Sequence, residues 1–162
     1  MALGTKPRWD KYDGYVGNYR APLGFDVDLA EDGTGEANRV LAVGLNSSGA
    51  IVKGGGQTGV TGLLIVAVGI DIHGNLLDGG INNMTGDPQD VGKHGEITNF
   101  EPYDASDPAN SPAAAAGTTY YGHPDGSVLA TVVDGAVYVG HTVEADRLIV
   151  DVAVPVLAVV AP

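Results

Sequence analysis

Residues 136–154 read AVYVGHTVEADRLIVDVAV, two apolar runs separated by a short polar stretch. The second run alternates, and one side of it carries Leu148, Val150, Val152 and Val154. Successive side chains of a β-strand point to opposite faces, so this pattern predicts a strand over 147–154 with one face against a core. The first run predicts a partner strand over 136–143.

The same pattern recurs along most of the chain. Seven more valine-rich runs, bounded by glycine, asparagine or aspartate, predict strands at 39–46, 50–53, 62–68, 89–91, 96–100, 118–121 and 128–133. Pro124-Asp125-Gly126 is a turn signal, and Asp134-Gly135 predicts a two-residue hairpin.

Helix signals are scarce, because 25 glycines and 9 prolines interrupt the chain. Residues 111–116 allow one short helical turn or a loop, and the two alternatives fit equally well. There is no repeat of fixed period, which argues against a solenoid or a propeller. The prediction is therefore an all-β fold, a small β-barrel or β-sandwich with an extended N-terminal arm and long loops.

Composition limits the function classes. The 162 residues suit a single domain, and a hydrophobic content of 44% is enough for a core. A net charge of −12 disfavours nucleic acid and anionic membranes as partners. The absence of cysteine excludes disulfides, thiolate metal sites and thiol nucleophiles. We find neither a signal peptide nor an apolar run of about 18 residues, so we expect synthesis in a cytoplasm and no membrane span.

Charge divides the chain into an N-terminal arm, residues 1–25, and a β-rich domain, residues 26–162. The arm has four basic and two acidic residues, net +2, which leaves −14 for the rest. It also carries Trp9 and three tyrosines. Basic and aromatic side chains together are typical of protein contact surfaces. Packing of the arm over its own domain is an equally good alternative.

Residues with catalytic or metal-binding chemistry do not form a convincing set. The glycine-rich residues 54–59 lack the lysine and hydroxyl pair of a phosphate-binding loop. Among four histidines only His94, with Glu96, has ligand spacing on one strand face, and a third ligand is missing. The pairs Asp71 with Asp78 and Asp87 with Asp90 lie in predicted loops, where solvated turn carboxylates are expected.

Other catalytic and ligand sites find little support. No serine lies in a nucleophile elbow, and residues 71–75 lack the ligands of a helix-loop-helix calcium site, although acidic loops leave calcium a minor alternative. We therefore expect no enzyme activity and no cofactor.

Several stretches form an ordered set: 19–23, 38–46 continuing through 51–54, 62–65, 86–91 with 94–97, 116–122 and 139–148. This set, which spans most of residues 19–150, resembles the capsid decoration (cement) proteins of tailed bacteriophages, in particular a type found in phages of actinobacteria. The sequence departs from that pattern between Gly69 and Met84, where 70–77 replaces a shorter basic connection.

The resemblance implies a small β-barrel protein on the outer surface of an icosahedral head. Members commonly bind as trimers at local threefold positions and clamp neighbouring subunits of the major capsid protein. The implied partners are the major capsid protein and two further copies of the chain, and the implied location is the virion.

Combining the arm with the resemblance gives two sets of candidate contacts. Contacts to the capsid are expected from Lys6, Arg8, Trp9, Lys11, Tyr12, Tyr15, Tyr19 and Arg20. Contacts between copies are expected from Leu148, Val150, Val152, Val154, Val156 and Leu157. Two alternatives remain: a head fibre or glycan-binding module that uses loops 70–84 and 101–117, whose only aromatic residue is Tyr103, and a small hydrolase or metal enzyme.

Overall fold

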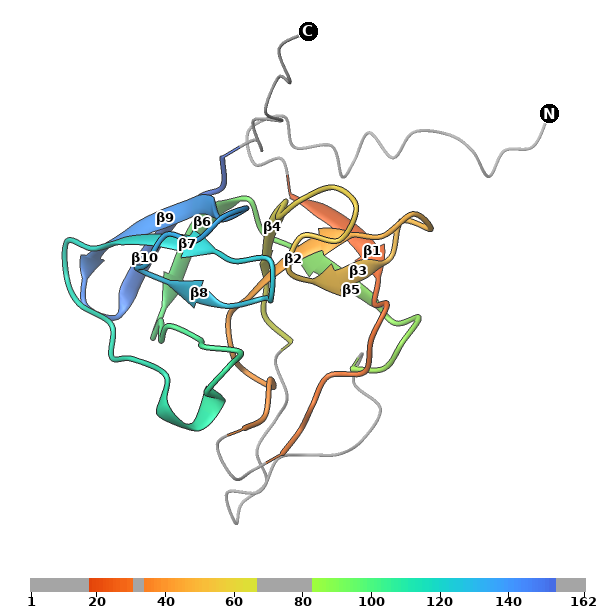
Figure 1. Cartoon of the computed structure of the whole chain (residues 1–162), viewed down its shortest axis with the longest axis horizontal. Helices are drawn as coiled ribbons and strands as arrows, with labels where there is room; N and C mark the ends of the chain where they lie inside the picture. Colours follow the sequence, from red (N-terminus) through yellow and green to blue (C-terminus); the bar gives the residue numbers. More distant parts are fainter. Residues whose placement is uncertain (1–17, 31–33, 67–82, 154–162) are drawn as a thin grey trace, which may run out of the picture.

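The structure is a computed structural model that describes residues 18–30, 34–66 and 83–153 (Figure 1). The strands in this part of the chain are β1 (Tyr19–Pro22), β2 (Leu41–Leu45), β3 (Ile51–Lys53), β4 (Gly62–Leu64), β5 (Pro88–Val91), β6 (His94–Thr98), β7 (Thr119–Gly122), β8 (Val128–Leu129), β9 (Val137–Glu144) and β10 (Arg147–Asp151). Outside the strands, the only helix in the described ranges is a 3-10 turn, η3 (Pro108–Asn110). The predicted all-β class is confirmed.

The strands form three sheets. The largest has the order β6-β10-β9-β7-β8, the second has the order β3-β2-β4, and β1 pairs with β5 in a third. Every pairing between these strands is antiparallel. The described sheets do not close into one barrel, and their arrangement is sandwich-like, in agreement with the second of the two predicted architectures.

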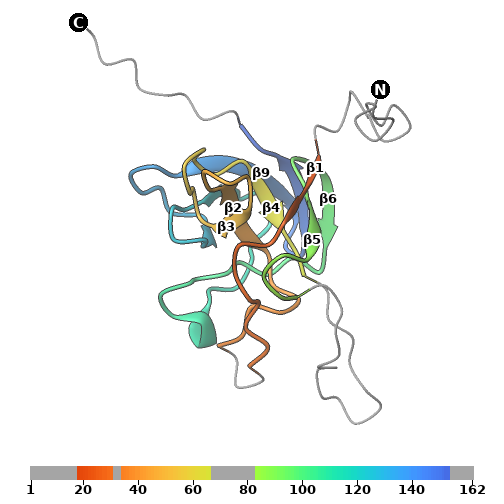
Figure 2. The same cartoon turned by 90° about the vertical axis from the view of Figure 1, so that its right-hand side faces the viewer.

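The sheet β3-β2-β4 lies between the other two (Figures 1 and 2), and its strands β2 and β4 are buried on both faces. In β2, Ala42 faces one hydrophobic cluster while Leu41 and Val43 face another. In β4, Leu63 faces the same cluster as Ala42, and Leu64 faces the other. A strand covered on both faces has no polar side, which explains why β2 is continuously apolar instead of alternating.

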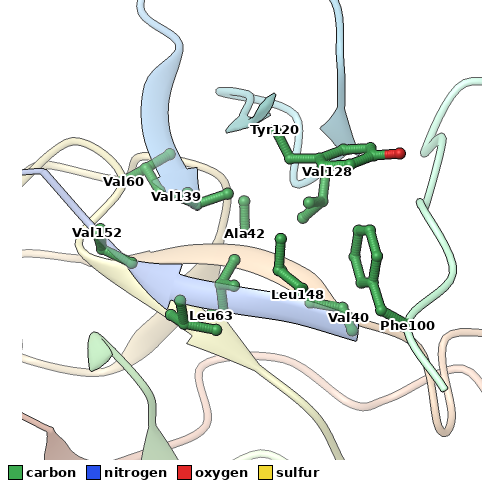
Figure 3. Packing of buried hydrophobic residues seen from close by; sticks show 11 residues of the cluster. Val40, Ala42, Val60, Leu63, Phe100, Tyr120, Val128, Val139, Leu148 and Val152 are labelled. Atoms are coloured by element: carbon green, nitrogen blue, oxygen red, sulfur yellow. The ribbon is translucent and has the colours of Figure 1, made fainter. Parts of the chain in front are cut away.

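The first cluster packs the five-stranded sheet against this middle sheet (Figure 3). Leu148 and Val150 of β10 enter it, as the alternation in the sequence predicts. Phe100 and Tyr120 meet edge to face, with ring centroids 4.9 Å apart. The Tyr120 hydroxyl accepts a hydrogen bond from the Ala115 backbone at 3.2 Å, so its polar end is satisfied at the cluster boundary.

The second cluster lies under β1 and β5. Leu23 is 1% exposed and packs with Val91 and Ile51. Residues 19–22 pair with 88–91 in register, Tyr19 opposite Val91 and Pro22 opposite Pro88. Residues 18–25, which the charge division assigns to the arm, are thus built into the folded body.

Residues 128–133 differ from the predicted strand. Only Val128 and Leu129 are in β8, while Val132 and Val133 are 67% and 44% exposed. The predicted Asp134-Gly135 hairpin is wrong as a strand connection, although Ala136 N donates to Val133 O at 3.0 Å and closes a turn there. The reason is pairing: β7 and β10 already occupy both edges of β9, so no edge is left for this segment.

The structure also shows the form of two other predicted connections. Gly126 N donates to His123 O at 3.0 Å, which makes Pro124-Asp125-Gly126 the predicted turn between β7 and β8. Residues 111–116 form no helix in the structure, so of the two alternatives the loop is the one observed. Residues 67 and 68 of the strand predicted over 62–68 lie outside the described residues.

Replacement of Gly54 by alanine is expected to destabilise the fold by about 2–3 kcal/mol. Gly54 has φ +69°, and an added Cβ would lie 1.8 Å from the Pro124 carbonyl oxygen. Gly49→Ala is the matched control, since Gly49 also has positive φ (+78°) but has no atom within 4 Å of the added carbon. Urea unfolding of both variants checks this; an equal loss for the two would show that the contact with Pro124 is unimportant.

Candidate functional site

The described chain begins and ends at the same end of the body (Figures 1 and 2). The Asn18 side-chain oxygen accepts hydrogen bonds from the backbone N–H groups of Lys93, at 2.7 Å, and His94, at 3.3 Å. Val152 N donates to Lys93 O at 2.9 Å. We call Asn18, Lys93, His94, Val152 and Ala153 the terminal end. Residues 1–17 and 154–162 therefore both connect to the body there.

Tyr19 and Arg20 are the two candidate capsid contacts within the described residues, and both are held by the body. The Tyr19 hydroxyl is 2.7 Å from Thr61 Oγ1, and burial raises the pKa of Tyr19. Arg20 binds Asp90 through two hydrogen bonds of 2.7 and 2.9 Å, which raise the pKa of Arg20. The other six candidates lie outside the described residues: Lys6, Arg8, Trp9, Lys11, Tyr12 and Tyr15.

Three of the six candidate contacts between copies belong to the interior of a single chain. Leu148, Val150 and Val152 are 0%, 6% and 4% exposed and pack in the first cluster. Leu148 and Val152 offer almost no surface to another copy, because the middle sheet already covers them, and Val150 reaches the surface only at the lining of a groove. The apolar alternation of β10 signals a core face and not an interface. Val154, Val156 and Leu157 lie outside the described residues.

The cations of the described body are largely paired with carboxylates. Lys53 binds the nearly buried Glu36, and Arg147 lies 3.3 Å from Glu144 and 3.7 Å from Glu96. Lys93, at the terminal end, makes no ion pair with any described residue. Sequence reasoning missed Asn18 and Lys93, since neither belongs to a recognisable motif.

The candidate metal ligands serve in cross-strand pairs. His94 Nδ1 lies 3.1 Å from Asp151 Oδ1, and Glu96 faces Arg147. In the described ranges no three histidine, aspartate or glutamate side chains converge as metal ligands would. Residues 71–75 and the pair Asp71 with Asp78 lie outside those ranges.

The carboxylates of the other predicted pair make separate contacts and do not converge on one site. Asp87 accepts from Met84 N at 3.0 Å, while Asp90 is the partner of Arg20. Asp26 accepts from the backbone N and the hydroxyl of Thr85 at 2.7 and 2.8 Å. These hydrogen bonds, the backbone one first, lower the pKa of Asp26 below its ordinary value of 3.8. Asp26 and Asp87 thus tie the segment after β1 to the turn before β5.

Acidification is expected to remove the stability that Asp26 contributes. Because its pKa is lower in the folded chain, the contribution is present above pH 3.8 and is lost as pH falls through that value toward the folded pKa. Asp26→Asn should therefore lower Tm at neutral pH, and the difference from the parent should shrink in stronger acid. Thermal unfolding across a pH series tests this, and a difference independent of pH would contradict it.

The glycine-rich residues 54–59 form a loop folded against β2. Leu45 N donates to Thr58 Oγ1 at 2.9 Å, and Gln57 N donates to Leu45 O at 2.8 Å. The backbone donors that would be needed to cradle a phosphate are partly used in this way, in agreement with the predicted turn.

Loop 101–117 is anchored to the body. Tyr103 is 3% exposed, and its backbone exchanges hydrogen bonds with Val128. A buried ring cannot serve as a stacking platform for a sugar, so the described part of these loops presents no aromatic side chain to a glycan. No helix among the described residues is long and apolar enough to cross a bilayer.

The chain is similar over nearly its whole length to a solved phage protein. No protein-family model matches the sequence, and no curated protein matches it. A protein chain from Mycobacterium phage Patience shares 45% sequence identity with a TM-score of 0.76, and the match covers 95% of this chain and 99% of that one. This chain therefore belongs to the same family of phage proteins as the protein of Mycobacterium phage Patience.

Proposed function

We propose that the protein is a capsid decoration protein that binds the outer surface of a phage head and stabilises contacts between major capsid protein subunits. In this proposal it acts by binding, without catalysis or a cofactor. It works as a homotrimer at threefold positions. Family membership with a mycobacteriophage protein agrees with the type of cement protein that the sequence resembles.

The observation that carries the proposal is the shared exit of both terminal segments. Residues 1–17 contain three basic residues, a tryptophan and two tyrosines, and they join the body at Asn18, beside Lys93. An acidic body that is joined at one end by a basic and aromatic segment has a charge asymmetry along its sequence that suits binding to a surface in one orientation. Three copies bound together would multiply modest contacts through effective concentration.

The direct test uses heads that lack the protein. Purified chain is mixed with undecorated heads of the corresponding phage, and the heads are recovered by sedimentation. The proposal predicts saturable binding, with density at threefold positions in images of the particles and a higher temperature of head disruption. If no protein sediments with the heads, even at concentrations well above those that saturate heads with cement proteins, the capsid role is refuted.

A head fibre or glycan-binding module is the second candidate, and the structure supplies one feature in its favour. Tyr121 and Tyr138 meet edge to face at 6.4 Å on the five-stranded sheet, with the Tyr138 hydroxyl 3.1 Å from His141. A glycan array separates the candidates: specific sugar binding lost in Tyr138→Ala, with no affinity for heads, would favour the second.

A further inference from the structure

A groove of about 250 Å³ opens beside the terminal end, between β4, β5 and β6. Half of its lining is aliphatic, from Leu63, Ile65, Val91, Ile97 and Val150. The other half consists of Asn18, Asp90, Gly92, His94 and Glu96. Ile65 is 38% exposed, although it belongs to an otherwise buried segment. The volume is below the roughly 300–1,000 Å³ typical of small-molecule sites, so short aliphatic side chains fit it better than a ligand does.

Strand β6 borders this groove and is an edge strand of the five-stranded sheet. Backbone groups alternate in direction along a strand. Lys93 O accepts from Val152 N, so Lys93, Gly95 and Ile97 direct their backbone groups toward β10. His94, Glu96 and Thr98 direct theirs to the open side.

Of these three residues, only His94 has a described hydrogen-bond partner for its backbone on the open side. His94 N donates to the Asn18 side chain at 3.3 Å. The backbone groups of Glu96 and Thr98 have no strand partner among the described residues. A half-aliphatic groove beside strand hydrogen-bonding groups without a strand partner is an arrangement that accepts an added β-strand.

We propose that residues 154–162 of a second copy add to β6 as a strand and place their side chains in this groove. The segment reads VPVLAVVAP and carries no charged side chain. Its residues 156–160 are rich in valine, which favours β structure, and they match the five residues of β6 in length.

The direction of the chain favours a second copy over the chain's own tail. Ala153 N donates to Tyr138 O at 3.0 Å, so the path of β10 continues between its neighbours up to the last described residue. Val154 precedes Pro155, and a residue before proline favours an extended backbone. The chain's own tail would have to reverse and pass over the end of β6 to reach its open side. Extended residues 156–160 cover about 17 Å of β6, and the stretch from Ala153 to Val156 reaches about 10 Å, so β6 of the next copy would begin within that distance of Ala153.

The N-terminal segment fits the groove less well. Residues 1–17 combine three basic and two acidic residues with three glycines, and they would bring charged groups onto the aliphatic half of the lining. The carboxylates in the lining, Asp90 and Glu96, already pair with Arg20 and Arg147 and do not need a basic partner from this segment. The inference extends the proposed function by naming the site at which copies join, and its test contains no heads, so either can fail without the other.

The absence of cysteine allows a direct test by disulfide trapping between copies. Ile65→Cys is mixed with Leu157→Cys or with Val156→Cys, because adjacent strand residues point to opposite sides. After mild oxidation, one of these mixtures is expected to give a covalent pair of chains that no single variant gives alone. Val132→Cys is the matched control, since Val132 is an exposed valine outside the groove lining.

Three results would overturn the inference. The first is that neither mixture with a cysteine in 154–162 gives a disulfide-linked pair of chains, and the second is that Val132→Cys gives as much of that pair as Ile65→Cys does. The third is that the double variant Ile65→Cys/Leu157→Cys forms its disulfide only within one chain. A mixture of Ile65→Cys with Tyr15→Cys identifies the N-terminal segment as the occupant if it gives the pair instead.

A second measurement does not depend on cysteine chemistry. The mass of the full chain by sedimentation is expected to exceed that of one copy, and to fall to one copy on deletion of 154–162 or in Ile65→Asp. Val132→Asp should keep the parent mass. A single-copy mass for the full chain, or an unchanged mass after the deletion, contradicts the inference.

Discussion

Deletion of residues 1–17 is expected to lower the affinity of the protein for undecorated heads about a hundredfold, while the body keeps its fold. Losing two contacts of about 1.4 kcal/mol each gives that factor, and tryptophan, tyrosine and arginine are the side chains that most often supply such contacts. The deletion stops before Asn18 because Asn18 binds β6 and Tyr19 begins β1. Co-sedimentation with heads over a concentration series measures the change.

Substitutions within the segment separate charge from aromatic contact. Lys6→Glu with Lys11→Glu should weaken binding, most strongly at low salt, whereas Lys6→Arg with Lys11→Arg preserves the charge and should bind as the parent does. Trp9→Ala should weaken binding at all salt concentrations. Unchanged affinity after deletion of 1–17 would show that the segment is not the capsid contact.

Replacement of Leu148 by alanine is expected to destabilise the chain by about 2–5 kcal/mol, a large part of the stability of a domain of this size. Leu148 is fully buried in the first cluster, where the sheets on either side cannot close the space that its side chain leaves. The reading of Leu148 as an interface residue predicts a different result, namely a folded chain that fails to associate. Chemical unfolding together with sedimentation distinguishes the two.

Ile149→Ala is the control for this substitution. Ile149 is the next residue of β10 and faces the opposite side of the sheet, where it is partly exposed, so its loss should cost much less. Equal unfolding midpoints for Leu148→Ala and Ile149→Ala would contradict the assignment of the core face.

Sequence patterns predicted individual strands better than their partners. Alternation identified the buried face of β10, and the continuously apolar β2 was recognised as a strand. The periodicity of a sequence does not show which strand edges pair. The sequence predicts a hairpin across Asp134-Gly135, whereas β9 pairs with β7 and β10 in the structure. The pairing of Tyr19 with Val91 joins residues far apart in sequence, and no local signal marks it.

The candidate site was predicted only in part, for a related physical reason. Charge and aromatic content identify the N-terminal segment as unusual, but they do not show where it joins the body. The terminal end arises from hydrogen bonds of Asn18 and Val152 to Lys93, which only the folded chain brings together. Apolar patterning also could not separate Leu148, which is buried inside one chain, from a residue that another copy would cover.

The orientation of the bound protein tests the central claim most directly. Imaging of decorated heads at a resolution that places the strands shows which end of the body meets the shell. We predict that Asn18, Lys93 and Ala153 face the major capsid protein, with loop 101–117 farther from it. A bound protein whose terminal end points away from the shell into solvent would contradict the account.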